Sequence, residues 1–160
     1  MVTLERIKEH LALVMDPEVP VLSIVDLGLV RSIEVKEAII TLGIAPTYTG
    51  CPAMDVIQDR VREVLSVFEA PIRIEVVLHP PWTTDWMSEA GKKKLEAYGI
   101  APPVGKAADK RSLWGPSPAV RCPRCKSEDT ALVSLFGSTA CKSLYQCQGC
   151  NEPFDYFKCF

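Results

Sequence analysis

The chain has 160 residues, of which 13 are proline, 9 glycine and 7 cysteine, and its formal net charge is −2. Apolar residues make up 48% and charged residues 24%, which is ordinary for a globular protein and excludes wholesale disorder. No run reaches the roughly 18 apolar residues of a membrane span, and the first residues lack the apolar core of a signal peptide. A cytoplasmic protein without a membrane partner is expected. A pI near 5.7 argues against a nucleic-acid partner bound through phosphates.

The first segment predicts an amphipathic helix. Apolar residues recur three, four and three positions apart and therefore share one stripe of a helix: Leu4, Ile7, Leu11 and Val14. Asp16-Pro17 should end this helix, because the residue before a proline is pushed out of the helical region. The segment 17–29 combines turn residues with short apolar runs and is expected to be an ordered loop.

Residues 30–45 predict a β-hairpin. Apolar and polar residues alternate on both sides of a reversal near Lys36-Glu37-Ala38. The reversal has no Asn-Gly signal, so the pattern leaves the register of the two strands open.

A second helix is predicted between Gly50 and Pro71. Its apolar face is formed by Ala53, Val56, Ile57, Val61, Val64, Leu65 and Phe68. A third strand follows, with apolar residues at alternate positions: Ile72, Ile74, Val76 and Leu78. The order helix, hairpin, helix, strand indicates a two-layer α+β unit.

Residues 83–98 predict a third helix, which Gly99 should end. It carries the run Lys92-Lys93-Lys94, which is more often a solvated helix face than a binding patch. Residues 99–118 hold four prolines and three glycines and show no apolar period, so they are predicted to be a linker. Two domains are therefore expected, at 1–98 and 119–160.

The tail predicts a metal site. Cys122-Pro-Arg-Cys125 and Cys147-Gln-Gly-Cys150 are two C-x-x-C pairs separated by 21 residues, and such pairs turn four thiolates toward one point. A unit of about 40 residues buries too little apolar surface to fold alone, and structural zinc supplies about 10–16 kcal/mol. A four-cysteine zinc ribbon is expected. Iron in place of zinc stays open, whereas a redox pair would need a βαβ setting that is missing.

The rest of the tail is less specific. Its five cationic and four anionic side chains give a net charge of +1, too little for a nucleic-acid patch. Its aromatic residues should form a miniature core or a protein-docking surface. Cys141 and Cys159 are left over, either as small buried hydrophobes or as extra thiolates for a second metal or cluster.

Cys51 differs from the other six cysteines because it lies at the predicted start of a helix. Gly50-Cys51-Pro52 suits the first helical position, where unpaired N–H groups and the helix dipole favour an anion. This placement predicts a lowered thiol pKa and a better metal ligand or nucleophile. The hydroxyls of residues 47–49 can hydrogen-bond to the sulfur or to a ligand. From position alone, a buried structural cysteine is an equal alternative.

Catalysis by Cys51 would need a base. His10 and His79 form no recognisable dyad with it. Three carboxylates flank the loop before the hairpin and suit turns as well as acid–base chemistry: Asp16, Glu18 and Asp26. A hydrolytic or transferase site is not expected.

Several segments carry a family resemblance. Residues 16–20 (Asp-Pro-Glu-Val-Pro), 26–30 (Asp-Leu-Gly-Leu-Val) and 47–52 (Thr-Tyr-Thr-Gly-Cys-Pro) resemble the signature loops of the iron–sulfur cluster assembly domain of SufT and MIP-type proteins. The resemblance continues through 80–87, and in the tail through 122–125, 138–142 and 152–159. With this tail, the chain is similar to the PaaD-type family, which belongs to the bacterial phenylacetyl-CoA ring epoxidase system.

The resemblance implies the fold class α+β: a two-layer α-β-β-α-β iron–sulfur cluster assembly-like domain followed by a small zinc ribbon. It implies an accessory or maturation subunit in phenylacetate catabolism that is not an enzyme. Such a protein would help to deliver an iron–sulfur cluster or iron to an oxygenase or reductase component. Its partners would be other subunits of the system, above all the iron–sulfur reductase, and a homodimer is compatible with it. The alternative is a structural adaptor without metal transfer.

The sequence agrees that this chain is neither oxygenase nor reductase. It has no Glu-x-x-His pair of a di-iron bundle, no dinucleotide fingerprint and no plant-type ferredoxin spacing of cysteines.

The resemblance also implies a site. Cys51 would be the ligand of a transient iron–sulfur cluster or iron, in a pocket lined by Asp16, Asp26, Thr47 and Thr49. One thiolate cannot hold a cluster alone, so the other ligands would come from another chain, a small thiol or a tail cysteine. The expected ligands of structural zinc are Cys122, Cys125, Cys147 and Cys150.

Overall fold

The structure is a computed structural model that describes residues 2–105 and 119–158, and these residues group into two compact units. Unit 1 comprises the residues up to Trp82 together with Trp86–Gly91. Unit 2 comprises Thr83–Asp85 and the residues from Lys92 onward. Among the described residues, no helix has the length and apolar character needed to cross a membrane.

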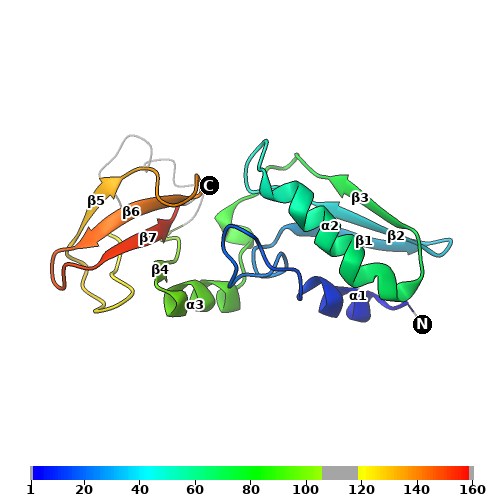
Figure 1. The fold of residues 1–160 in the computed structure, drawn as a ribbon, viewed down its shortest axis with the longest axis horizontal. Helices are drawn as coiled ribbons and strands as arrows, with labels where there is room; N and C mark the ends of the chain where they lie inside the picture. The colour runs from blue at the N-terminus through cyan, green and yellow to red at the C-terminus, as the bar shows by residue number, and fades with distance from the viewer. Residues whose placement is uncertain (1, 106–118, 159–160) are drawn as a thin grey trace. The chain divides into compact units, whose positions relative to one another are not determined.

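Unit 1 is built from a three-stranded sheet and two helices (Figure 1). Its elements follow in the predicted order: α1 (Leu4–Leu11), β1 (Val30–Lys36), β2 (Ile39–Ile44), α2 (Ala53–Leu65), the 3-10 turn η1 (Ser66–Phe68) and β3 (Ile72–Val76). The strand order is β1-β2-β3, with β1 antiparallel and β3 parallel to the central strand β2. The α-β-β-α-β arrangement predicted from the sequence is confirmed.

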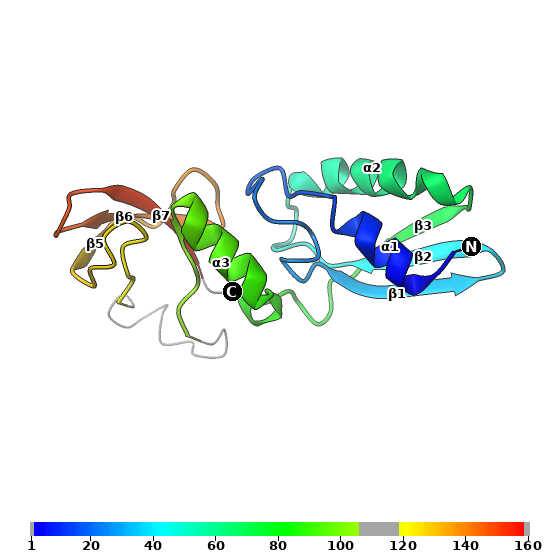
Figure 2. The same ribbon diagram turned by 90° about the horizontal axis from the view of Figure 1, so that it is seen from below.

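One face of this sheet is apolar because the register aligns alternating residues of three strands. Ile40, Leu42 and Ile44 of β2 are 0% exposed, and each is paired with apolar residues on both neighbouring strands. Helices α1 and α2 lie on the same side of the sheet (Figure 2) and add their buried side chains to this layer: Ile7, Leu11, Ala53, Met54, Ile57, Val61 and Leu65. Each such side chain larger than alanine contributes about 1.5–3 kcal/mol on leaving water, so this layer is the core of unit 1.

Helix α1 ends at Leu11, earlier than the sequence predicts. The backbone leaves the helix because Ile24 N–H donates to the carbonyl of Val14 at 2.9 Å, and Met15 and Ser23 form an antiparallel bridge. Val14 is buried, but outside the helix. The segment 17–29 is an ordered loop, as predicted, because it contributes its own apolar side chains to the interior: Val19, Leu22, Ile24, Leu27 and Leu29.

The single helix predicted over 83–98 is two elements, the 3-10 turn η2 (Thr84–Trp86) and α3 (Glu89–Tyr98). The break occurs at Ser88, whose N–H donates to the carbonyl of Asp26 at 2.9 Å while its hydroxyl accepts the N–H of Gly91 at 2.9 Å. A serine that caps the following turn starts a new helix there. The predicted stop at Gly99 is confirmed, because its φ is +93° and its N–H donates to Glu96 at 3.1 Å.

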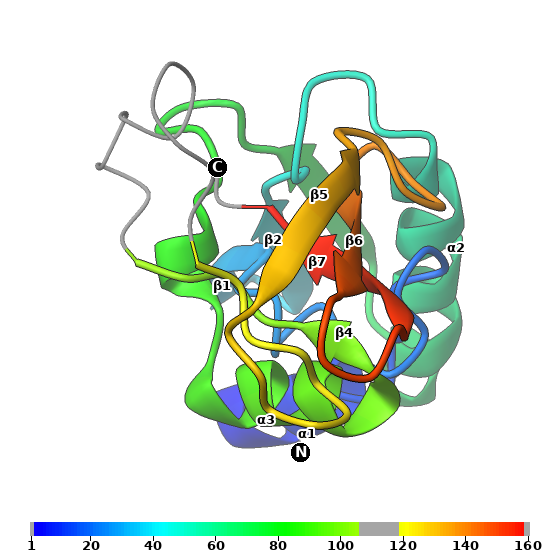
Figure 3. The same cartoon turned by 90° about the vertical axis from the view of Figure 1, so that its left-hand side faces the viewer.

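Unit 2 contains a four-stranded sheet in the order β4-β7-β6-β5, of which β5, β6 and β7 lie next to one another in Figure 3. Its strands are β4 (Ile100–Ala101), β5 (Thr130–Ser134), β6 (Lys142–Cys147) and β7 (Pro153–Phe157). The side chains of Tyr145, Phe154 and Tyr156 pack ring against ring in a small core that also takes in Val120.

Strand β4 lies inside the predicted linker. Ile100 and Ala101 are apolar and buried, and they pair in parallel with Asp155 and Tyr156 of β7. The start of the segment 99–118 is therefore structured, because two apolar residues suffice to complete a sheet edge. Residues 106–118 of the predicted linker lie outside the described residues.

Candidate functional site

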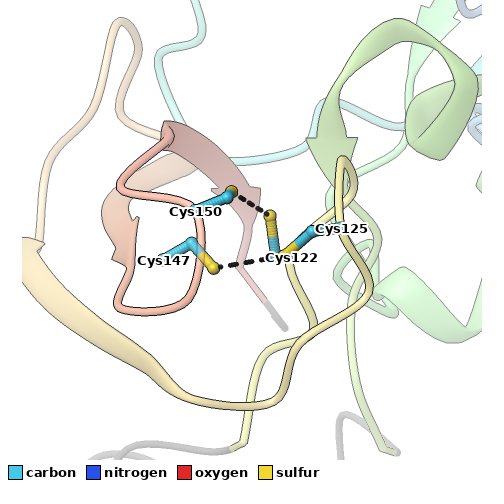
Figure 4. A group of neighbouring side chains, drawn as sticks. All are labelled: Cys122, Cys125, Cys147 and Cys150. Carbon is cyan, nitrogen blue, oxygen red and sulfur yellow. Dashed lines mark hydrogen bonds between the residues drawn. The ribbon is translucent and has the colours of Figure 1, made fainter.

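Four cysteine sulfurs of unit 2 converge on one point (Figure 4). The Sγ atoms of Cys122, Cys125, Cys147 and Cys150 all lie within 4.8 Å of one another. The closest pairs are Cys122 with Cys150 at 3.8 Å and Cys125 with Cys147 at 3.5 Å. Ligands about 2.3 Å from a tetrahedral metal ion stand about 3.8 Å apart, so these spacings fit one bound ion. The four predicted ligands thus form a metal-binding cluster.

Two similar backbone turns build this cluster. The residue after each C-x-x-C pair is left-handed, with φ +65° at Lys126 and +61° at Asn151. In the first turn, Lys126 N–H donates to the carbonyl of Cys122 at 3.0 Å. In the second, hydrogen bonds from the backbone N–H of Cys150 and from the Cys125 thiol lower the pKa of the Cys147 thiol to about 7. The neighbouring thiols raise the pKa of Cys150 to about 12, so the first proton leaves the cluster at Cys147. A thiolate is therefore accessible near neutral pH, which is what a metal ligand requires.

Cys51 lies just before helix α2, at the end of a short loop. Pro52 is the N-cap of the helix, and the thiol of Cys51 is 9% exposed. The loop is closed by Cys51 N–H, which donates to the carbonyl of Tyr48 at 3.2 Å, and by Met54 N–H, which donates to the carbonyl of Cys51 at 3.2 Å. The backbone of Cys51 is thus fixed at the start of the helix.

The prediction of a lowered pKa for Cys51 is wrong. Burial raises the pKa of this thiol, and the negative charge of Glu18 raises it further. The N–H of Ala53 and the hydroxyls of Thr47 and Tyr48 act in the opposite direction, because they can hydrogen-bond to a thiolate. The sequence shows the favourable helix start, but it does not show that the thiol is buried beside a carboxylate.

The four residues expected beside Cys51 have different surroundings. Thr47 is half-buried, and its hydroxyl lies 4.0 Å from the Sγ of Cys51, whereas Thr49 is exposed. Asp16 is buried and accepts the N–H groups of Glu18 at 2.8 Å and Val19 at 2.9 Å. Its carboxylate therefore shapes the turn that carries Glu18.

Asp26 is buried among serines. Its Oδ2 accepts the N–H and the hydroxyl of Ser23 at 3.1 and 3.0 Å, and its Oδ1 accepts the hydroxyl of Ser88 at 3.4 Å. These bonds close the loop before β1 and attach the start of α3 to it. The carboxylate of Asp26 thus has a clear structural task.

Glu18 is the residue of this site that the sequence alone does not single out as a neighbour of the thiol. Its charge acts on Cys51, although 33 positions separate the two residues. The available signal is the segment 16–20, in which the turn formed by Asp16 fixes where the carboxylate of Glu18 stands.

Of the two leftover cysteines, Cys141 is described, and it is not part of the four-cysteine cluster. Cys141 is 3% exposed, and its Sγ lies 2.9 Å from the hydroxyl of Thr139. Cys159 lies outside the described residues.

Known proteins resemble both parts of the chain. Residues 4–76 match the family model described as iron–sulfur cluster assembly protein, and residues 106–158 match the model described as PaaD zinc beta ribbon domain. A protein of Escherichia coli strain K12, named as a component of 1,2-phenylacetyl-CoA epoxidase, is 47% identical over 90% of this chain and 86% of its own length.

Relatives of the N-terminal part occur without the tail. The Fe-S protein maturation auxiliary factor SufT of Staphylococcus aureus is 39% identical over 52% of this chain and 97% of its own. The crystal structure of a DUF59 domain from Bacillus anthracis superposes with a TM-score of 0.54 at 33% identity, over 57% of this chain and 89% of that one. With two family models in tandem and a relative that spans most of its length, the chain belongs to the PaaD family of the phenylacetyl-CoA epoxidase system.

Proposed function

We propose that this protein is a non-catalytic accessory component of a phenylacetyl-CoA epoxidase system that accepts an iron–sulfur cluster or iron at Cys51. It then passes this cargo to an oxygenase or reductase component. The supporting observation is the surroundings of Cys51: a buried thiol with a backbone N–H, two hydroxyls and the carboxylate of Glu18 around it. These groups lie in the part of the chain that matches the iron–sulfur cluster assembly family.

The chemistry of a single buried thiol suits transfer better than storage. The raised pKa keeps the Cys51 thiol protonated at rest, so binding of iron must displace its proton. One thiolate and nearby oxygen ligands hold a cluster weakly, and the missing ligands must come from a donor, a small thiol or the recipient. Delivery then needs only the exchange of one thiolate for another, with no change of oxidation state.

We propose that the four-cysteine cluster holds zinc and serves structure. Four sulfurs at tetrahedral spacing leave no open position for a substrate, which is typical of structural zinc. In this proposal all four cysteines bind the zinc ion and cannot act as additional ligands of a cluster at Cys51. None of the six described cysteines forms a disulfide, which fits a reducing compartment such as the cytoplasm.

We assign the transfer role to the domain at 1–98 and client docking to the ribbon at 119–160, with the iron–sulfur reductase as the first client to test. In this scheme Asp16 and Asp26 shape the loops of the site, while the hydroxyl of Thr47 lies 4.0 Å from the sulfur. Thr49, which is exposed, would meet only cargo or a partner.

The test is anaerobic reconstitution of the full chain with ferrous iron and sulfide, followed by incubation with the apo reductase component. Cys51→Ser should lose the iron and sulfide bound in excess of the ribbon metal, and it should no longer restore reductase activity. Cys141→Ser is the matched control, because it removes a buried thiol that belongs to neither site. A Cys51→Ser protein that still loads and delivers like the wild type would refute the proposal.

A second candidate function, a structural adaptor of the epoxidase system, is favoured by one observation. Val133, Leu135 and Phe136, on β5 and just beyond it, are 57%, 62% and 68% exposed. Exposed apolar side chains that adjoin one another indicate a surface for another protein. The adaptor would be favoured over the transfer protein by stable co-purification with the other components that is lost in Phe136→Ser. Cys51→Ser should then still co-purify and leave the activity of the epoxidase system unchanged.

A further inference from the structure

A cavity of about 340 Å³ lies in unit 1 between helix α1 and strand β1, and neither metal nor cluster chemistry explains it. Leu4, Lys8 and Leu11 line it from α1, where spacings of four and three residues place them on one stripe. Val30, Arg31 and Ile33 line it from β1. Leu11 is fully buried, whereas Leu4 is 45% exposed. The cavity is therefore an open groove with apolar walls.

Two cations stand at this groove without an anion. Lys8 and Arg31 are exposed, and among the described residues no carboxylate lies within ion-pair distance of either. Unpaired cations next to apolar surface attract a ligand that combines an apolar group with a negative charge. Two of them beside one groove make the groove complementary to an anion.

The backbone places Arg31 there. The register of β1 against β2 shifts between Val30 and Ser32, so Arg31 is the extra residue of a β-bulge. Bulges redirect a side chain out of the regular alternation and are frequent next to binding sites. The guanidinium lies 3.5 Å from the centre of the Trp86 ring, which restricts its motion and reduces the entropy lost on binding.

The edge of the sheet is available as well. Within the part of the chain that the structure describes, β1 pairs only with β2, and most of its residues are exposed. An edge strand of seven residues can accept an additional extended segment through backbone hydrogen bonds. An open groove beside such an edge suits a peptide segment better than a small molecule, which needs a site that encloses most of its surface.

From these features we infer that the α1–β1 groove binds an extended acidic segment of a protein partner, with an apolar side chain in the groove and carboxylates on Lys8 and Arg31. The apolar walls accept the side chain and the two cations determine the sign of the charge. This interaction does not involve Cys51, so it stands or falls separately from the transfer of iron.

The experiment uses the labelled full chain and an array of eight-residue peptides. Two positions are fixed as glutamate in one half of the array and as lysine in the other, and the neighbouring positions sample apolar and polar residues. We expect selection of peptides with glutamate and an adjacent apolar residue. Their dissociation constants, measured by fluorescence anisotropy, should rise at least tenfold in Lys8→Glu and in Arg31→Glu. In these two variants the dissociation constant should also increase less steeply with added salt than it does in the wild type.

Arg73→Glu is the matched control, because Arg73 is an exposed arginine on β3 of the same sheet, outside the groove. Arg73→Glu and Cys51→Ser should bind the selected peptides like the wild type. The inference is overturned if the array shows no preference for glutamate, or if Arg73→Glu weakens binding as much as Arg31→Glu. It is also overturned if 4-phenylbutyrate shifts the amide signals of α1 and β1 while the peptides do not, since the groove would then be a site for a small carboxylate.

Discussion

The indole N–H of Trp82 donates to the carbonyl of Leu27 at 2.7 Å, although 55 positions separate the two residues. Ser88 makes a parallel attachment through Asp26, whose carbonyl accepts the N–H of Ser88. Two stretches that the sequence presents as separate signatures, 26–30 and 80–87, are therefore one structural feature. The contribution of its residues to the free energy of unfolding can be measured by single substitutions.

Replacing Trp82 by phenylalanine should destabilise the protein by about 1–3 kcal/mol. The change leaves the buried carbonyl of Leu27 without its donor, and that desolvation cost is not recovered. Denaturant unfolding followed by circular dichroism measures the change. Tyr98→Phe, at a position that is 58% exposed, should change the free energy of unfolding by less than about 0.5 kcal/mol. Equal effects at both positions would argue against the role of this bond.

Two glycines with nearly the same backbone angle should respond differently to alanine. At Gly28 (φ +70°) and at Gly50 (φ +78°), a left-handed side chain costs about 1–2 kcal/mol. At Gly28 an added Cβ would also clash with the carbonyl oxygen of Trp86, whereas at Gly50 it meets none of the described residues within 4 Å. Gly28→Ala should therefore have a clearly lower midpoint of thermal unfolding than Gly50→Ala. Indistinguishable midpoints would show that Trp86 does not pack on Gly28.

The raised pKa of Cys51 makes a prediction for alkylation. Because the thiolate is the reactive form, iodoacetamide should modify Cys51 more slowly than an ordinary thiol at pH 7.5, and the rate should rise as the pH increases past the ordinary thiol range. Quantitative mass spectrometry of the Cys51 peptide gives the rate. The same shift implies that the stability contributed by the protonated thiol is present at low pH and is lost as the pH rises, since the unfolded chain releases this proton first.

Glu18→Gln should accelerate that alkylation at a fixed pH. Removing the negative charge lowers the pKa of Cys51, and each decrease of the pKa by about 0.5 raises the thiolate fraction about threefold. Glu75→Gln on β3 removes an equal, exposed charge from another part of the unit and should leave the rate unchanged. If both variants react alike, the carboxylate of Glu18 does not act on the thiol.

Removal of the ribbon metal should unfold the ribbon and leave unit 1 folded. Its core is small and includes the ligands Cys122 and Cys147 themselves, so the apolar surface cannot maintain the sheet without the ion. Chelation at neutral pH should abolish the dispersed amide signals of Tyr145 and Phe154 and retain those of Ile40 and Leu42. Elemental analysis should find one metal ion per chain before chelation. A ribbon that keeps its dispersed signals without metal would contradict this prediction.

The sequence predicts well those elements in which burial follows a simple period. Alternation over 30–45 and 72–78 reveals the strands, and the spacing of apolar residues after Pro52 reveals α2. The register of the hairpin could not be predicted because its turn residues are unusual. Glu37 and Ala38 adopt φ +49° and +62°, angles at which asparagine or glycine is normally found. Helix α1 and the segment after Trp82 differed from prediction because single long-range hydrogen bonds, from Ile24 and from Ser88, ended the local pattern.

The sites divide in the same way. The ribbon cluster was predictable because its ligands are encoded by spacing alone, as two C-x-x-C pairs. The environment of Cys51 was predictable only in part. Thr47 is a near neighbour in the sequence, whereas Glu18 is distant in the sequence and is brought near the thiol by folding. Burial, which decides the direction of the pKa shift, is a property of the packed structure and not of the segment 47–52.

The ribbon sheet begins before its first cysteine. Ile100 and Ala101 form one edge of it, and Lys126 in the first metal-binding turn forms an ion pair with Glu96 of α3. Loss of the ion would loosen both attachments, so a protease should gain access to the chain around residues 96–101, more than 20 positions ahead of Cys122. Proteolysis at a segment that contains no metal ligand would thus report whether the ribbon holds its metal ion.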